Sequence, residues 1–138
     1  EAVFSVVIRD TDEAVMEALK AEFLDSVERA AQTHRLRAAL AQRSWIKPVA
    51  LDPELRRIFR QAAEARGLAY REMPSGAGHD AQTMAALCPS ALVFVPSHDG
   101  ISHSPGEHTD WHYIPPAAQL MLDALIRISD ARPRATGD

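Results

Sequence analysis

One long polar loop, residues 96–114, contains four of the six histidines in this sequence, the residue type most often used to bind zinc. Its histidines are His98, His103, His108 and His112, and its acidic residues include Asp99, Glu107 and Asp110. Neutral imidazole is a common zinc ligand, and carboxylates often complete such sites. No spacing within the loop matches a self-contained zinc motif, so a hydrogen-bonded surface role is the simpler alternative for any single histidine.

A glycine-containing turn, Ser75–Asp80, is the second place where chemistry is expected. Gly76 and Gly78 permit positive φ angles and a close approach of the backbone to a ligand. The turn precedes a predicted helix, and amide groups at a helix N-terminus attract anions and carbonyl oxygens. His79 could contact a ligand and Asp80 could simply cap the helix, so the pattern leaves functional and structural roles open.

Two further residues, Arg9 and Cys88, carry a charged and a reactive group outside these segments. The Arg9 guanidinium could bind a substrate carboxylate through two parallel hydrogen bonds, or it could form a surface ion pair. Cys88 is the single cysteine and cannot form an internal disulfide, which suits a reducing cytoplasm. Since no base is placed beside Cys88, we expect it to be a small core residue.

Alternating strands and helices are predicted to position these residues. Strands are expected over residues 3–9, 37–45, 68–72 and 91–95, the last of them buried on both faces. Helices are expected from Asp10 or Thr11 to about Gln32, from Pro53 (capped by Asp52) to about Arg66, from Asp80 to about Leu87, and from Pro115 to about residue 130. This order indicates an α/β class, with helices packed on a parallel or mixed sheet.

Apolar side chains at three- and four-residue spacing mark the faces that three of these helices should bury. In the first helix the stripe is Val15, Leu19, Phe23, Val27 and Ala30. In the second it is Leu55, Ile58, Phe59 and Ala62, and in the last it is Ala117, Leu120, Met121, Ala124, Leu125 and Ile128.

The composition is that of an ordinary soluble domain. The 138 residues are 46% hydrophobic and 25% charged, and their net charge of -4 disfavours a nucleic-acid partner, because phosphate binding needs a basic face. No apolar run approaches the ~18 residues of a membrane span, and no signal peptide is visible. We therefore expect a cytoplasmic protein with no membrane partner. Because a strand is predicted almost from Glu1, we also expect a fragment of a larger protein.

Three segments, Met73–Ala81, Pro89–Ser97 and Asp99–Glu107, carry a resemblance to a known family. They resemble the C-terminal region of the N-carbamoyl-L-amino-acid hydrolase and allantoate amidohydrolase family, in the superfamily of dinuclear zinc aminoacylases and carboxypeptidases. More loosely, Val7–Asp10 resembles the family's strand with a substrate-binding arginine. Pro48–Pro53 resembles the family's return from a lid domain to the catalytic domain.

The resemblance implies an architecture and a set of site residues. Residues 1–48 would form the closing part of an α+β lid and dimerisation domain, and residues 49–138 the C-terminal part of a zinc-exopeptidase-like α/β catalytic domain. The implied site residues are Arg9 for the substrate carboxylate, Gly76, Gly78 and His79 along the substrate, and His103 as a metal ligand, with Glu107 in an unspecified supporting role.

The resemblance also implies an activity. The intact protein would be a metal-dependent amidohydrolase that cleaves a linear C–N amide or ureido bond in a small molecule of the N-carbamoyl amino acid or allantoate type. It would use two divalent ions, zinc or manganese, and would form a homo-oligomer, such as a dimer. The family's other metal ligands and its general-base glutamate would lie upstream of Glu1. The chain alone is therefore expected to be inactive and to hold no metal stably.

Two alternatives to a hydrolase fragment stay open at this point. The first is a non-catalytic, truncated oligomerisation or interaction module. The second is a small self-contained metal-binding protein that uses His98, His103 and His108, which the absence of a zinc motif disfavours. Which substrate the intact enzyme would take is also undecided, because family members share these motifs across substrates.

Overall fold

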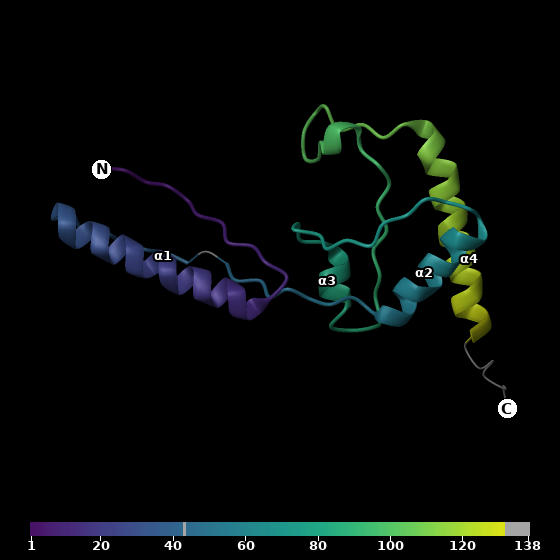
Figure 1. Cartoon of the computed structure of the whole chain (residues 1–138), viewed down its shortest axis with the longest axis horizontal. Helices are drawn as coiled ribbons and strands as arrows, with labels where there is room; N and C mark the ends of the chain where they lie inside the picture. The colour runs from purple at the N-terminus through teal and green to yellow at the C-terminus, as the bar shows by residue number, and fades with distance from the viewer. Residues whose placement is uncertain (43, 132–138) are drawn as a thin grey trace. The chain divides into compact units, whose positions relative to one another are not determined.

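The computed structural model describes residues 1–42 and 44–131, and the regular elements within these residues are all helical. In chain order they are α1 (Glu13–His34), α2 (Pro53–Ala65), α3 (Asp80–Met84), the short 3-10 helices η1 (His98–Gly100) and η2 (Trp111–Tyr113), and α4 (Ile114–Ala131) (Figure 1). The chain divides into two compact units. The first contains Glu1–Ala50 and Pro74–His79, and the second contains Leu51–Met73 and the residues from Asp80 onward.

Side-chain hydrogen bonds define the start of α1 in the first unit. The Asp12 carboxylate accepts a hydrogen bond from the Ala14 N–H at 2.8 Å, so Asp12 is the N-cap rather than Asp10 or Thr11. Asp10 lies before the helix, and its carboxylate accepts a hydrogen bond from the N–H of the N-cap residue Asp12 at 2.9 Å. The helix then continues to His34, slightly beyond its predicted end.

The sheltered face of α1 differs in part from the predicted stripe. Val15 and Leu19, predicted to be buried, are 41% and 43% exposed. The most sheltered apolar residues are instead Met16, which is buried, and Phe23, Val27 and Ala31, which are half-buried. The prediction was therefore right for Phe23 and Val27 and wrong for Val15, Leu19 and Ala30, which are exposed.

Contacts from outside α1 explain this shift. The ammonium group of Lys20 lies 4.6 Å from the ring centroid of Trp45, a cation–π contact. Lys47 pairs with Glu13 at 2.9 Å, and this hydrogen bond raises the pKa of Lys47. The segment that follows α1 thus lies along the side of the helix that carries Glu13 and Lys20, and it leaves Leu19 exposed.

The start and end signals predicted for α2 are confirmed in the second unit. The Asp52 carboxylate accepts a hydrogen bond from the Leu55 N–H at 2.8 Å, and Pro53 is the first helical residue. Gly67 follows the helix with a φ of 63°, and the Leu68 N–H donates to the Ala63 carbonyl at 3.0 Å. The buried residues of this helix are Ile58, Ala62 and Ala63.

The second unit is organised around the contact between α2 and α4, which lie side by side in Figure 1. Ala62 on α2 and Ala124 on α4 are both fully buried, and small side chains at a helix contact shorten the distance between the axes. At the end of α2, the Arg66 Nη2 donates to Asp123 of α4 at 3.0 Å, and Gln119 donates to the same carboxylate oxygen at 3.2 Å.

The exposed side of α4 is more apolar than predicted. Of the predicted face, Ala117, Leu120 and Ile128 are half-buried beside Ala124, but Met121 and Leu125 are exposed. Despite these apolar residues, none of the helices in the described part of the chain combines the length and apolarity that crossing a membrane requires.

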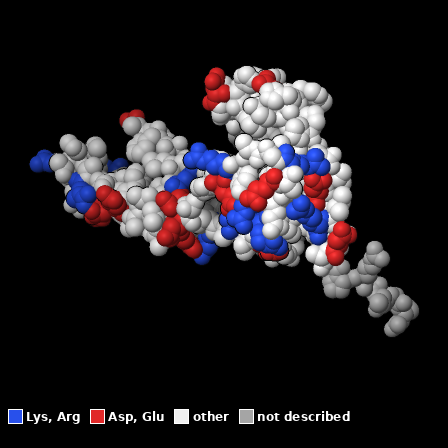
Figure 2. Space-filling view, turned by 45° about the vertical axis from the view of Figure 1, so that its right-hand side comes forward, with Lys and Arg blue, Asp and Glu red and all other residues white. Residues whose placement is uncertain are grey.

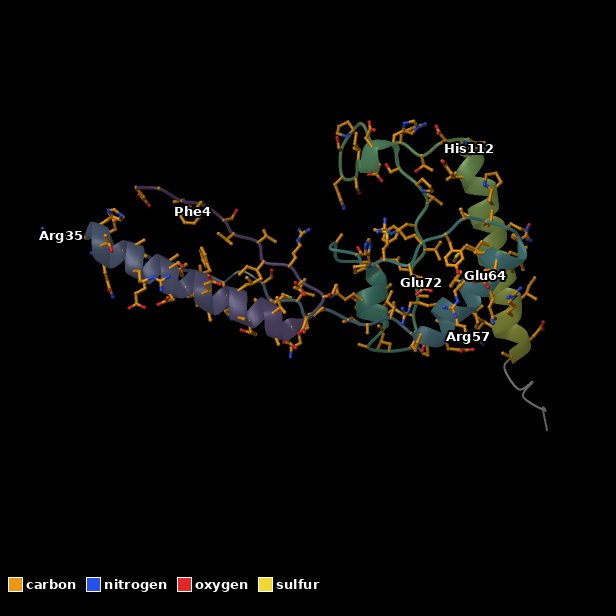
Figure 3. The ribbon with its side chains drawn as sticks, viewed as in Figure 1. Phe4, Arg35, Arg57, Glu64, Glu72 and His112 are labelled. Atoms are coloured by element: carbon orange, nitrogen blue, oxygen red, sulfur yellow. The ribbon has the colours of Figure 1, made fainter. Side chains whose placement is uncertain are left out.

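Polar contacts hold the segment after α2 against that helix. Glu72 accepts from Arg56 at 3.5 Å and from Arg60 at 3.4 Å, and Figure 3 shows Glu72 beside α2. The Tyr70 hydroxyl donates to Glu64 at 2.7 Å. Figure 2 shows acidic and basic side chains intermingled on the displayed face. Exposed pairs of this kind contribute roughly 0–1 kcal/mol each, so they position the segment more than they stabilise it.

Helix α3 and the residues after it correct two smaller predictions. The helix ends at Met84 rather than at Leu87, and a turn hydrogen bond from the Leu87 N–H to the Met84 carbonyl at 2.8 Å follows it. Asp80 is the first residue of α3 and not its N-cap. Cys88 is exposed rather than part of the core, while its neighbour Ser90 is buried and donates to the Cys88 carbonyl at 3.0 Å.

The segments predicted as strands do not form strands in the part of the chain that the structure describes. Over residues 3–9, 68–72, 91–95 and the described part of 37–45, no ladder of backbone hydrogen bonds is present. A strand requires such a ladder with a neighbour. Val3 and Phe4 are 87% and 74% exposed, and Figure 3 shows Phe4 on this N-terminal segment. The strand predicted over residues 3–9 is thus unpaired, and the α/β class stays a prediction.

Replacing Asp52 with alanine is expected to destabilise α2 by about 1 kcal/mol, because the Leu55 N–H loses its acceptor. The free energy of unfolding in urea, followed by far-ultraviolet circular dichroism, measures this change. Asp52→Asn is the matched control, since an asparagine oxygen can cap the helix equally well. Equal losses in the two variants would show that capping is not the cause.

The pKa of Asp123 is expected to lie below its ordinary value, because the hydrogen bond from Arg66 favours the ionised carboxylate. A lowered pKa in the folded state means that this contact stabilises the protein above the ordinary carboxyl pKa and is lost as the pH falls through the lowered value. A carbon-13 NMR titration of the carboxyl groups measures the shift. Arg66→Gln should raise the pKa of Asp123, and Arg57→Gln should leave it unchanged. The same Asp123 pKa in all three proteins would contradict the assignment.

Candidate functional site

Arg9 and Gly76 lie 67 positions apart in the sequence and are joined by a hydrogen bond within the first unit. The Arg9 Nη1 donates to the Gly76 carbonyl oxygen at 3.1 Å. A guanidinium group has five N–H donors, and this contact uses one of them. The side chain is exposed, so the same group can still present a pair of donors to a carboxylate. The structure thus brings together two predicted site residues that the sequence treats separately.

The turn that contains the glycines is held by Ser75. The Ser75 hydroxyl lies 2.9 Å from the His79 Nε2 and accepts from the backbone N–H two residues later at 3.2 Å. Neither Gly76 nor Gly78 adopts the positive φ that the sequence pattern would permit. A Cβ added at Gly76 would meet no atom within 4 Å. Gly76 therefore leaves open space beside the backbone. At the end of the turn, His79 is half-buried.

His103 occupies an unusual backbone conformation in the second unit. Its φ is 55°, in the left-handed region that non-glycine residues adopt only in a few per cent of cases. The His103 N–H donates to the Glu107 Oε2 at 2.9 Å, and the Glu107 N–H donates to the Ser104 carbonyl at 2.9 Å. Glu107 therefore closes a tight turn around His103 and holds the backbone that carries the imidazole. The supporting role that the resemblance implies for Glu107 stays a prediction.

Two other histidines of the loop are gathered around Asp110. The His98 Nε2 lies 2.9 Å from the Asp110 Oδ1, and the His108 Nε2 lies 3.5 Å from the same oxygen. The hydrogen bond from His98 holds the pKa of Asp110 below its ordinary value, with smaller contributions from the charges of the neighbouring histidines and a partial offset from desolvation. The Asp110 carboxylate is therefore ionised at neutral pH.

His103 is not part of this cluster. Within residues 1–42 and 44–131, His98, His108 and Asp110 form the one group of three or more donors close enough to hold a metal ion. A zinc site uses three or four protein ligands. The described chain therefore does not assemble a metal site around His103, and its residues do not by themselves fit the pair of metal ions that the resemblance implies.

The predicted site residues are distributed over both units of the chain. Arg9, Gly76, Gly78 and His79 belong to the first unit, and His103 belongs to the second. Sequence reasoning missed the contact of Ser75 with His79, although a hydroxyl four residues before a histidine could have suggested it. It also missed the meeting of His98, His108 and Asp110, for which the sequence offers no regular spacing.

The backbone closely resembles a solved enzyme structure. The crystal structure of an amidase of the hydantoinase/carbamoylase family from Burkholderia multivorans superposes with a TM-score of 0.80 at 40% sequence identity. The superposition covers 86% of this chain and 29% of that protein.

Curated relatives point in the same direction. The chain is 31% identical to the allantoate amidohydrolase of Bacillus subtilis over 126 residues, which are 91% of this chain and 31% of that protein. It is 26% identical to the N-carbamoyl-L-amino-acid amidohydrolase of Rhizobium meliloti over 130 residues, which are 94% of this chain and 31% of that protein. The chain thus spans less than a third of the length of these relatives.

The family itself follows from a match over most of the sequence. Residues 1–127 match the model of peptidase family M20/M25/M40. Together with the allantoate and N-carbamoyl-amino-acid amidohydrolases among its relatives, this match confirms the resemblance carried by the glycine turn and the His103 loop. The chain belongs to peptidase family M20/M25/M40.

Proposed function

We propose that this chain is part of a hydrolase that cleaves linear C–N bonds in a small carbamoyl or ureido compound, such as an N-carbamoyl amino acid or allantoate. The names of the relatives support this substrate class. The structural observation that carries the proposal is the hydrogen bond from Arg9 to Gly76, because it places a cation suited to carboxylates beside the glycine turn. Both substrate types carry a carboxylate.

Arg9 would anchor the substrate carboxylate. The bond to the Gly76 carbonyl orients the guanidinium while leaving donors for a two-point contact with a carboxylate. The open space at Gly76 would let the substrate approach the backbone closely. Gly78 lies in the same turn, and His79 would lie beside the substrate with its ring oriented by the Ser75 hydroxyl.

In the intact enzyme, the site would hold two divalent metal ions, zinc or manganese, and His103 would be one of the ligands of this pair. Since His103 belongs to no group of three or more possible metal donors among the described residues, the remaining ligands would come from parts of the enzyme outside this chain. Glu107 would act as a positioning residue, because its carboxylate holds the His103 backbone N–H. Outer contacts of this kind typically change metal affinity or activity by about 10–100-fold when removed.

The assignment extends to the architecture of the intact enzyme. Residues 1–48 would belong to the lid and dimerisation domain and residues 49–138 to the catalytic α/β domain of a cytoplasmic homo-oligomer. The exposed apolar residues of the N-terminal segment, among them Val3, Phe4 and Val7, support packing against other parts of such an assembly.

The isolated 138-residue chain is expected to release no ammonia from N-carbamoyl amino acids or allantoate above a protein-free blank, even with zinc or manganese added. The reason is that His103 has no second and third metal ligand in the described chain. A coupled assay for ammonia measures the release. Turnover by the chain that disappears in His103→Ala would contradict this expectation.

A chimera tests the proposed activity itself. Residues 1–127 replace the matching segment of the Bacillus subtilis allantoate amidohydrolase, and hydrolysis of allantoate is measured. We expect activity in the chimera, loss of activity in His103→Ala, and a fall in kcat of about 10–100-fold in Glu107→Ala. His34→Ala, at the end of α1, is the matched control and should be neutral.

The chimera can also refute the assignment. A folded chimera, verified by circular dichroism and metal content, whose kcat is unchanged in His103→Ala would exclude His103 from the site. Arg9→Lys should raise KM for the carboxylate substrate more than it lowers kcat, because lysine cannot make the two-point contact. An unchanged KM would exclude Arg9 as the carboxylate anchor.

A further inference from the structure

The side chains of His98, His108 and Asp110 lie close together in the loop after Ser97, and His103 is not among them. We propose that His98, His108 and Asp110 form a binding site for one divalent transition-metal ion of the zinc class. This site is separate from the function assigned to His103 and does not rest on that assignment. It uses three residues for which neither the family resemblance nor the proposed hydrolysis has a role.

The distances between the donor atoms suit such an ion. The His98 Nε2 and the His108 Nε2 lie 2.9 Å and 3.5 Å from the Asp110 Oδ1, and one donor atom from each of the three residues lies within 4.8 Å of the others. With zinc–ligand bonds of roughly 2.0–2.1 Å in a tetrahedral arrangement, neighbouring donors are about 3.3–3.4 Å apart. Small side-chain rotations would therefore bring all three donors to one ion.

The backbone of the loop pre-arranges these residues. The His98 N–H donates to the His108 carbonyl at 2.8 Å, which holds the two histidines opposite each other. The Ser97 hydroxyl donates to the Ile101 carbonyl at 2.6 Å and closes the η1 turn. The two imidazole rings are tilted relative to each other, with centroids 5.3 Å apart and planes inclined by 50°. The backbone thus holds the three side chains close together, and only side-chain rotations are left to complete the site.

The donor set selects among metal ions. Two imidazoles and one carboxylate are ligands that zinc, cobalt and nickel accept well, whereas magnesium prefers an all-oxygen octahedron. All three side chains are substantially exposed, so water can occupy the remaining coordination position. The competing explanation for the contact between His98 and Asp110 is a simple ion pair without a metal. Such a pair would not explain why His108 also approaches the Asp110 Oδ1.

Titration of the full 138-residue chain with zinc alone, followed by calorimetry, tests the site, and cobalt absorption reports the coordination geometry. We expect one equivalent of zinc to bind and magnesium not to compete. His98→Ala, His108→Ala and Asp110→Asn should each weaken zinc binding roughly tenfold or more. His112→Ala is the matched control, because His112 lies close by in η2, just before α4, and its ring contacts Tyr113 (Figure 3).

Other outcomes would overturn the proposal. The absence of zinc binding to the folded chain would do so, as would binding that survives in His98→Ala and His108→Ala. Loss of binding in His103→Ala with retention in His108→Ala would assign the ion to His103 instead. Because Asp110→Asn preserves the shape of the side chain, and circular dichroism verifies the helices of every variant, unfolding cannot be mistaken for the loss of a ligand.

Discussion

Backbone hydrogen bonding is the constraint on which the rest of this structure depends. A helix satisfies its N–H and C=O groups within one segment, whereas an extended segment needs a neighbour. The helices α1 and α2 meet this requirement by themselves, and Asp12 and Asp52 complete their first turns. The segments over residues 3–9 and 91–95 find no ladder partner among the described residues and expose Phe4 and Phe94. Helices, whose hydrogen bonds are local, therefore form in the described residues, whereas strands, which need a partner segment, do not.

The same distinction explains how much of the fold could be predicted from the sequence. Asp52, Pro53 and Gly67 act on the backbone within a few residues, so the sequence specifies the ends of α2 correctly. The buried face of α1 could be predicted only in part, because the contact of Lys20 with Trp45 comes from outside the helix. For the strands, apolar composition indicates that burial is favourable, but it does not supply the partner against which burial would occur.

The candidate site shows a similar division between residue type and residue placement. Arg9 and His103 can be selected from the sequence by their chemistry and by the motifs around them. The hydrogen bond from Arg9 to Gly76 cannot, because it joins positions 67 apart. The approach of His108 to Asp110 depends on the backbone hydrogen bond that pairs His108 with His98, and no periodic pattern encodes that bond.

The backbone at His103 adopts a conformation that is less favourable for histidine than for glycine. A left-handed conformation costs a non-glycine residue on the order of 1–3 kcal/mol, whereas glycine adopts it freely. Gly100, three residues earlier, uses that freedom at a φ of 67°. His103 adopts a φ of 55° with a full side chain, and the carboxylate of Glu107 holds its N–H. A turn that had only to reverse the chain could be made with glycine at lower cost. Arg35 and Asp99 adopt the same region at φ angles of 54° and 53°, and at His103 the hydrogen bond to Glu107 offsets part of the cost of this conformation.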